Sequence, residues 1–375
     1  MTNEVADVAG GRRVDFLDNL RTAIVFLVVL YHAGGVYEAT GMWASFWIVD
    51  DPSTNTVSGL TGLVLDIFLM PTLFFVSGYF VPASLRNRSR WIFLRTKFRR
   101  LMLPWIVAVL VLIPLYKVMF LLSRGLPQQS WTTYFHFSNG FISQSWLWFL
   151  PVLFAFNVLY VLGSMVRMRV PNVTLKGAVI GTFVVGFAYS AGMDLLGFRG
   201  WTLTPFIDFQ HERVLIYLMF FLVGTLCSTQ RAFDGRPRGT VLYNVVNSTA
   251  WIPITVYIFF LIFPVVFNPG GFVFSRIVDR TIVWFCFHLS LLCLVYGVVQ
   301  TFWRYLDRPG PIWSELNPSA YHVYIIHVIV LGLIAMLLLN TAMPSVLKHF
   351  ILAASTYVAC NLIVMLSRRV VITRA

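Results

Sequence analysis

The sequence predicts an all-α, polytopic transmembrane helix bundle of about ten helices with both termini in the cytoplasm. Of the 375 residues, 58% are hydrophobic and only 11% are charged, whereas soluble domains carry roughly a quarter charged residues. Mean hydropathy is +0.77. A chain this apolar cannot cover a surface that faces water, and in lipid its backbone groups must pair internally. Its apolar runs are about 20 residues long, the length of a spanning helix rather than a barrel strand.

Ten such runs follow one another along the chain. We expect helices over residues 15–37, 59–82, 101–122, 145–163, 177–196, 213–228, 241–267, 281–303, 321–339 and 350–367. Prolines inside some runs, such as Pro104 and Pro253, are tolerated in helices that pack in a membrane bundle. No internal repeat or soluble domain is visible. We therefore expect one membrane domain over 15–367, between cytoplasmic tails at 1–14 and 368–375.

The basic residues between the runs predict the orientation. With the N-terminus inside, the inner segments carry 20 lysine and arginine residues and the outer segments carry 6. Cytoplasmic loops of membrane proteins carry this excess, so both termini are expected in the cytoplasm. The protein itself is expected in the cell membrane. The same pattern explains the net charge of +13 without a nucleic-acid partner. The four cysteines lie in apolar runs with no C-x-x-C pair, so we expect small core residues and no metal site.

The segment 83–100 is the most basic part of the chain. It reads ASLRNRSRWIFLRTKFRR, with seven basic residues and no acidic one. One interpretation is a helix that rests on anionic lipid at the inner surface. The other is a phosphate clamp for a cytoplasmic ligand that carries a nucleotide, formed by Arg95, Arg99 and Arg100. The sequence favours neither, and one segment can do both.

The first run carries ionisable residues, which are candidates for function because their burial in a membrane is costly. Arg21 and His32 are 11 residues apart, which places them on one helix face about 16 Å apart along the axis. Asp18 is close enough to pair with Arg21. Because the chain enters from the cytoplasm, Arg21 is expected near the inner surface and His32 in the outer half. A single histidine on an apolar helix is more often structural than catalytic. The helix face that His32 shares with Arg21 modestly favours a catalytic role.

Five short motifs lie in order along the chain. They are FLDNLRTAIVFLVVLYH, MPTLFFVSGYF, FLRTKFRRLMLPW, WLWFLP and AYHVYIIHVIVL, and they run from Phe16 to Leu331. They resemble the Arg–ten residues–His opening helix, the FF-x-x-SG motif, the R-x-x-R-L-x-x-P segment, the W-F-L helix start and the Y-x-x-Y-x-x-H motif of the acyltransferase 3 family. The closest branch resembles glucan-succinylating enzymes. Thr72 stands where many members carry an acid, and WLWFLP replaces a W-S-L-x-x-E motif, so the roles of those acids do not carry over.

This resemblance implies a membrane O-acyltransferase. Its donor would be cytoplasmic acyl-coenzyme A with an acyl group of the acetyl or succinyl class, used as a substrate, with no bound cofactor. Its acceptor would be a hydroxyl of an extracytoplasmic glycan, glycolipid or related molecule. Arg21 would position the donor and a neutral His32 would take the hydroxyl proton; a transient acyl-histidine is a second scheme. The rival class is a transporter of an acyl compound or glycan, although the sequence shows no repeated halves.

Three further candidates are expected toward the outer side, and Asp66 among them at the depth of His32. Asp66, in the outer part of the second run, could orient that histidine in catalysis or make a structural contact. Trp146 and Trp148 begin the fourth run at its outer end. An aromatic belt at the membrane surface is the simpler interpretation of these tryptophans, and binding of an acceptor sugar by stacking is the alternative.

The remaining candidates are weaker. Tyr324 and His327 begin the ninth run at its inner side. Packing and hydrogen bonding between helices is the favoured interpretation for both, and binding of the donor is the second. His136, His211 and Glu212 fall in outer loops, where they could contact an acceptor.

Overall fold

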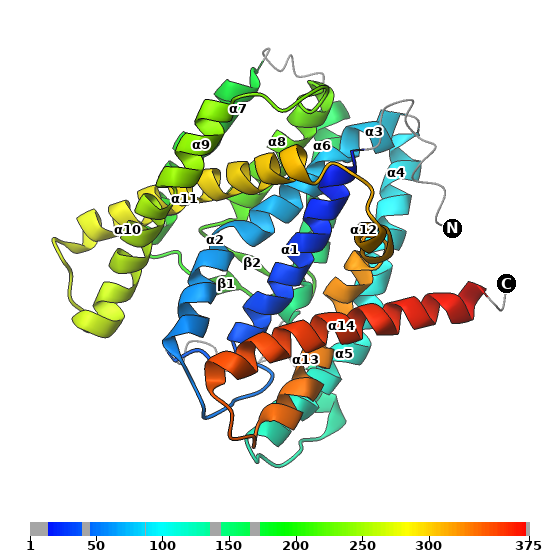
Figure 1. Ribbon diagram of the computed structural model, residues 1–375, viewed down its shortest axis with the longest axis vertical. Helices are drawn as coiled ribbons and strands as arrows, with labels where there is room; N and C mark the ends of the chain where they lie inside the picture. The colour runs from blue at the N-terminus through cyan, green and yellow to red at the C-terminus, as the bar shows by residue number, and fades with distance from the viewer. Residues whose placement is uncertain (1–13, 40–45, 87, 136–143, 166–172, 373–375) are drawn as a thin grey trace.

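The computed structural model describes residues 14–39, 46–86, 88–135, 144–165 and 173–372, and these parts are almost entirely helical (Figure 1). The longer helices are α1 (Asp15–Gly34), α2 (Thr56–Tyr79), α5 (Leu103–Ser123), α6 (Phe149–Met165), α7 (Leu175–Leu195), α8 (Val214–Thr229), α10 (Trp251–Ile262), α11 (Arg276–Tyr305), α13 (Ala320–Leu338) and α14 (Ser345–Ile372). The shorter ones are α3 (Val81–Arg86), α4 (Arg90–Lys97), η1 (Phe98–Met102), η2 (Trp131–Phe135), η4 (Ser145–Trp148), α9 (Thr240–Thr249), η5 (Phe263–Phe267) and α12 (Pro311–Leu316). A small antiparallel hairpin pairs β1 (Trp201–Thr202) with β2 (Phe209–Gln210).

The predicted fold class is confirmed. Within the described residues, nine helices are long and apolar enough to cross a membrane, some built from adjoining segments such as Arg90–Ser123. The sixth predicted run corresponds to the shorter apolar helix α8. All ten predicted runs are therefore helical, and the protein is a polytopic membrane bundle. The division into one domain and two tails stays a prediction, and the first tail up to residue 13 lies outside the described residues.

The local sequence explains several helix ends. Asn55 caps α2 by accepting the backbone N–H of Ser58 at 2.8 Å, and Ser89 caps α4 by accepting that of Ile92 at 3.3 Å. Side chains of this type are preferred at such positions because they satisfy an otherwise unpaired N–H. Within the basic segment 83–100, a new helix therefore begins at Arg90. This helix continues through the π-helical turn η1 into the spanning helix α5.

The centre of the bundle is formed around α1, which crosses the middle of the view between α2 and α13 (Figure 1). Helices α2 and α8 approach closely at two glycines. A Cβ atom at Gly78 would stand 2.0 Å from the carbonyl oxygen of Phe221, and one at Gly224 would stand 2.1 Å from that of Phe75. Small residues allow this close backbone approach between membrane helices. The glycine of the FF-x-x-SG motif therefore serves helix packing.

Candidate active site

Helices α1 and α13 run side by side in the same direction. The Thr22 hydroxyl donates to Asn317 Oδ1 at 2.6 Å, and ten residues further along each chain segment His32 Nδ1 meets His327 Nε2 at 3.0 Å. Ten residues rise about 15 Å in each helix. The two helices thus keep one register, and the histidines lie at the same depth. The expectation that His327 lies at the inner side is wrong. Asn317, which precedes α13, lies level with Thr22 near the start of α1, so His327, ten residues further along, lies at the depth of His32.

The two histidines form a hydrogen-bonded pair whose protons can be assigned from the neighbours. His327 Nδ1 lies 2.7 Å from the carbonyl oxygen of Tyr324. A carbonyl oxygen only accepts, so Nδ1 of His327 carries the proton and, in a neutral ring, its Nε2 is an acceptor. The bond at 3.0 Å is then donated by His32 Nδ1 to His327 Nε2. In a neutral His32 ring the lone pair is therefore on Nε2, the nitrogen that a general base uses.

Trp47 covers His32 from the segment that follows α1. Its ring stacks on the imidazole with a centroid separation of 5.1 Å and an angle of 11°. Its indole N–H donates to the carbonyl oxygen of His32 at 3.1 Å, and the side chain is buried. The sequence pattern does not reveal this residue, because Trp47 lies in a connection outside the predicted runs and no spacing rule links it to α1.

His32 lines a cavity of about 70 Å³, large enough for a few water molecules. The predicted residues Asp66, Trp146 and Trp148 line the same cavity, so the structure brings together all four side chains expected near the chemistry. The polar side chains Tyr31, Tyr217, Gln210 and Tyr324 and the indole of Trp201 also line it. The site is thus an aromatic chamber with a histidine and a carboxylate in its wall.

Asp66 contacts a cation rather than the histidine ring. Its Oδ2 accepts a hydrogen bond from Arg213 Nη1 at 2.6 Å, and Tyr31 Oη stands 3.5 Å from its Oδ1. The group that contacts His32 Nδ1 is His327. The role of orienting His32, which the sequence suggested for Asp66, is therefore taken by His327, and Asp66 holds Arg213 at the N-terminal end of α8.

Trp146 faces the interior of the protein. It is 3% exposed, its indole N–H donates to the carbonyl oxygen of Ile325 at 2.9 Å, and its own carbonyl oxygen accepts the hydroxyl of Tyr324. This burial contradicts the interpretation of Trp146 as part of a membrane-surface belt. Trp148 is half-buried and packs edge-on against Trp201 at a centroid distance of 5.2 Å. Both rings are thus placed where a substrate in the cavity could touch them.

The residues predicted to hold the donor remain separate in the structure. Arg21 pairs with Asp18 at 3.0 Å, as its spacing predicted. Arg95, Arg99 and Arg100 are exposed on α4 and η1, and in the described part of the chain no hydrogen bond or ion pair joins any of them to Arg21. Arg95 also lines a shallow apolar groove with Trp91, Phe98 and Phe154, among others.

The outer-loop candidates have separate surroundings. His211 Nε2 lies 2.5 Å from the hydroxyl of Thr202, and Glu212 is buried and accepts the N–H of Gly200 at 3.1 Å. His136 lies outside the described residues. Within the described ranges, no group of three or more His, Cys, Asp or Glu side chains could hold a metal ion.

Comparison with protein families matches residues 14–366 to a family described as Acyltransferase domain. Among curated proteins and among solved structures, no significant match is found. The matched range covers nearly the whole chain, from before the first candidate spanning helix of the described residues into the last one, Ser345–Arg369. The chain therefore belongs to the acyltransferase 3 family of membrane proteins.

Proposed function

We propose that this membrane acyltransferase transfers an acetyl or succinyl group from cytoplasmic acyl-coenzyme A to a hydroxyl of an extracytoplasmic glycan, glycolipid or related acceptor. The observation that carries the proposal is His32 in the wall of the aromatic cavity, hydrogen-bonded to His327 so that its Nε2 lone pair can act as the base. A neutral imidazole near a reacting hydroxyl is a common general base.

The reaction would proceed as follows. His32 Nε2 removes the proton of the acceptor hydroxyl, and the hydroxyl oxygen attacks the thioester carbonyl carbon. The C–S bond then breaks, and the coenzyme A thiolate takes the proton back from His32. The hydrogen bond between His32 Nδ1 and His327 holds the ring in one tautomer during the transfer. A two-step route, in which His32 itself carries the acyl group, uses the same nitrogen.

The donor would approach from the inner end of α1. Arg21 and the basic residues Arg95, Arg99 and Arg100 lie in segments that the charge distribution assigns to the cytoplasmic side, where coenzyme A phosphates can meet guanidinium groups. From Arg21 to His32 the helix rises about 16 Å, a distance that the pantetheine arm would have to bridge.

The deciding experiment uses purified protein, acetyl- or succinyl-coenzyme A with a labelled acyl group, and a glycan or lipid extract as acceptor. His32→Gln should lose about 10²–10⁴ in rate, the usual contribution of one positioned base, while it remains folded and binds the donor. His322→Gln, on the exposed face of α13, is the matched control and should keep full activity. Near-normal transfer by folded His32→Gln would refute the proposal. Donor binding or flux without thioester cleavage in the wild type would favour a transporter.

A further inference from the structure

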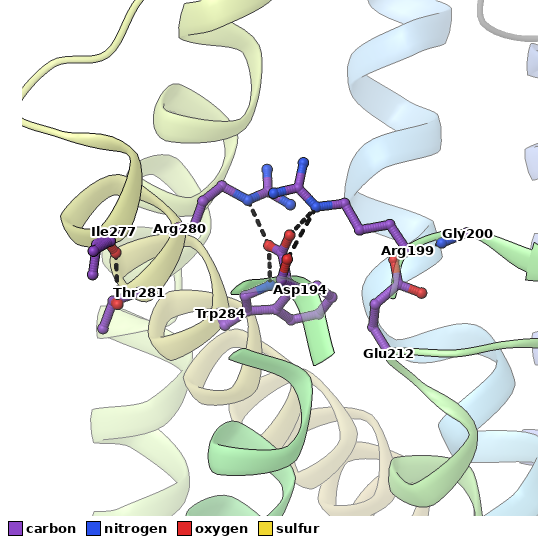
Figure 2. Close-up of polar contacts among 8 residues, drawn as sticks. All are labelled: Asp194, Arg199, Gly200, Glu212, Ile277, Arg280, Thr281 and Trp284. Carbon is purple, nitrogen blue, oxygen red and sulfur yellow. Dashed lines mark hydrogen bonds and ion pairs between the residues drawn. The ribbon is translucent and has the colours of Figure 1, made fainter. Parts of the chain in front are cut away.

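A second polar cluster lies at the C-terminal end of α7 (Figure 2). Asp194 is fully buried, and its Oδ2 accepts hydrogen bonds from Arg280 Nε at 2.5 Å and Trp284 Nε1 at 2.6 Å. Arg199 Nε forms an ion pair with Oδ1 and donates to the backbone carbonyl oxygen of Asp194 at 3.4 Å. Arg280 and Trp284 come from the first turns of α11, and Arg199 comes from the loop that leads to β1. One carboxylate thus holds two guanidinium groups, and the three ionised side chains together carry one positive charge.

The cluster has more cationic donors than the carboxylate can use. Both arginines contact Asp194 through Nε, and in the described part of the chain their four Nη atoms have no protein partner. Figure 2 shows the two guanidinium groups beside each other above the carboxylate, with these terminal nitrogens turned away from it. The Arg199 side chain is 42% exposed and that of Arg280 20%. A structural ion pair needs only one of these cations, so the second remains to be explained.

The two other carboxylates near the cluster are held by backbone N–H groups rather than by the arginines. Glu212, the other acidic residue in Figure 2, accepts the N–H of Gly200 at 3.1 Å and makes no ion pair with either arginine among the described residues. Asp279, next to Arg280 in the chain, is buried and accepts the backbone N–H groups of Val273 and Phe274 instead. Two adjacent guanidinium groups with unused donors are suited to a phosphate group, which they can bind with several charge-assisted hydrogen bonds.

The cluster is linked to the cavity by a short stretch of chain. Arg199 precedes the cavity residue Trp201 by two positions, and the hairpin then returns through Gln210, also in the cavity wall, to Arg213, which holds Asp66. The charge distribution assigns this hairpin and the start of α11 to the outer side, where the acceptor is expected. A phosphate bound at the cluster would therefore sit beside the acceptor end of the cavity.

We propose that Arg199 and Arg280 form a binding site for a phosphate group at the outer face, and that this site holds a phosphate-bearing acceptor, or the headgroup of an anionic lipid, beside the cavity. The use of the site in catalysis rests on the function proposed above; its ability to bind phosphate does not.

The test measures binding rather than acyl transfer. Inorganic phosphate, against chloride at equal ionic strength, is titrated into the detergent-purified protein while the unfolding temperature is recorded. In parallel, native mass spectrometry measures retention of phosphatidylglycerol relative to phosphatidylcholine. Arg199→Gln leaves Asp194 with two donors, Arg280 and Trp284, so the protein should still fold. Loss of one charge-assisted bond should weaken phosphate or phosphatidylglycerol binding about tenfold or more.

Two further variants make the result decisive. Arg276→Gln removes an exposed arginine one turn before Arg280 on α11 and should leave binding unchanged. His32→Gln, which decides the proposed function, should also leave it unchanged, so the two proposals fail separately. If inorganic phosphate binding depends on Arg199, a soluble phosphate group is the ligand; if only phosphatidylglycerol retention does, the ligand is a lipid headgroup. If neither is present in the wild type, or neither is weakened by Arg199→Gln, the proposal is overturned.

Discussion

At the scale of single residues, the position of one proton decides which nitrogen of His32 can act as a base. The carbonyl oxygen of Tyr324 fixes the proton on His327 Nδ1, and His327 Nε2 in turn fixes the proton on His32 Nδ1. Groups that act in this way through another residue affect turnover more than binding. His327 is therefore a positioning residue in the proposed reaction, and the alternative is that it binds the donor directly.

The two roles of His327 predict different kinetics. His327→Phe removes the acceptor for His32 Nδ1–H and should lower kcat about 10–100-fold, the usual cost of losing a partner that orients a functional histidine. The KM for acyl-coenzyme A should stay within about threefold. His327→Gln, whose amide oxygen can accept the same bond, should restore part of kcat. Steady-state kinetics of both variants measure this, and a raised donor KM with unchanged kcat would show that His327 binds the donor.

At the scale of helices, the contact between α2 and α8 depends on the absence of two side chains. At Gly78 and Gly224 the backbones of the two helices lie very close together. A Cβ atom at either position would overlap a carbonyl oxygen of the other helix. Backbone cannot move aside as the end of a flexible side chain can, so any substitution must separate the helices. The two helices also hold Asp66 and Arg213, which pair at 2.6 Å near the cavity, so a separation would reach the site.

Alanine substitutions test this packing. Gly78→Ala and Gly224→Ala should each lower the free energy of unfolding by at least about 1–3 kcal/mol, the usual range for overpacking, and reduce the yield of monodisperse protein. Gly163→Ala on α6, where a Cβ atom would meet nothing within 4 Å, is the control, and it should be neutral or stabilising by up to about 1 kcal/mol because alanine favours a helix. Thermal unfolding in detergent gives the comparison. Equal behaviour of all three variants would mean that the two helices do not pack this closely.

At the scale of the whole molecule, contacts between connections agree with the two-sided topology. Gln230 Nε2 donates to the carbonyl oxygen of Val173 at 2.8 Å, and both residues lie in segments assigned to the inner side. Lys348 Nζ and Asp51 Oδ2 form a buried ion pair at 3.0 Å, and both lie in segments assigned to the outer side. Segments on opposite sides of a bilayer could not meet in this way, since about 30 Å of hydrocarbon separates them.

Cysteine labelling tests which side is cytoplasmic. In a background in which Cys227, Cys286, Cys293 and Cys360 are replaced by alanine, single cysteines are introduced by Ser130→Cys in an outer segment and Ser89→Cys in an inner one. Both positions are exposed. An impermeant maleimide should label Ser130→Cys on intact cells and Ser89→Cys only after permeabilisation, because the 20-to-6 distribution of basic residues places 83–100 inside. The reverse pattern would invert the topology.

The number and order of the spanning helices could be predicted from the sequence because they depend on local properties. A bilayer requires about 20 apolar residues per helix, so composition within each run decides the element. The ion pair of Asp18 and Arg21 was predictable for the same reason, since three residues in a helix set a fixed distance. Membership of the acyltransferase family could likewise be inferred from short motifs.

The partners in the site could not be predicted in this way. His32 and His327 are 295 residues apart, and the relative depth of α1 and α13 depends on how Thr22 and Asn317 set the register of the two helices. Asp66 shares the cavity with His32 but is held by Arg213, 147 residues further along the chain. Periodicity shows which face of a helix a residue occupies. Which helix packs against that face, and at what height, is a property of the whole bundle, so only the tertiary structure decided the histidine pair.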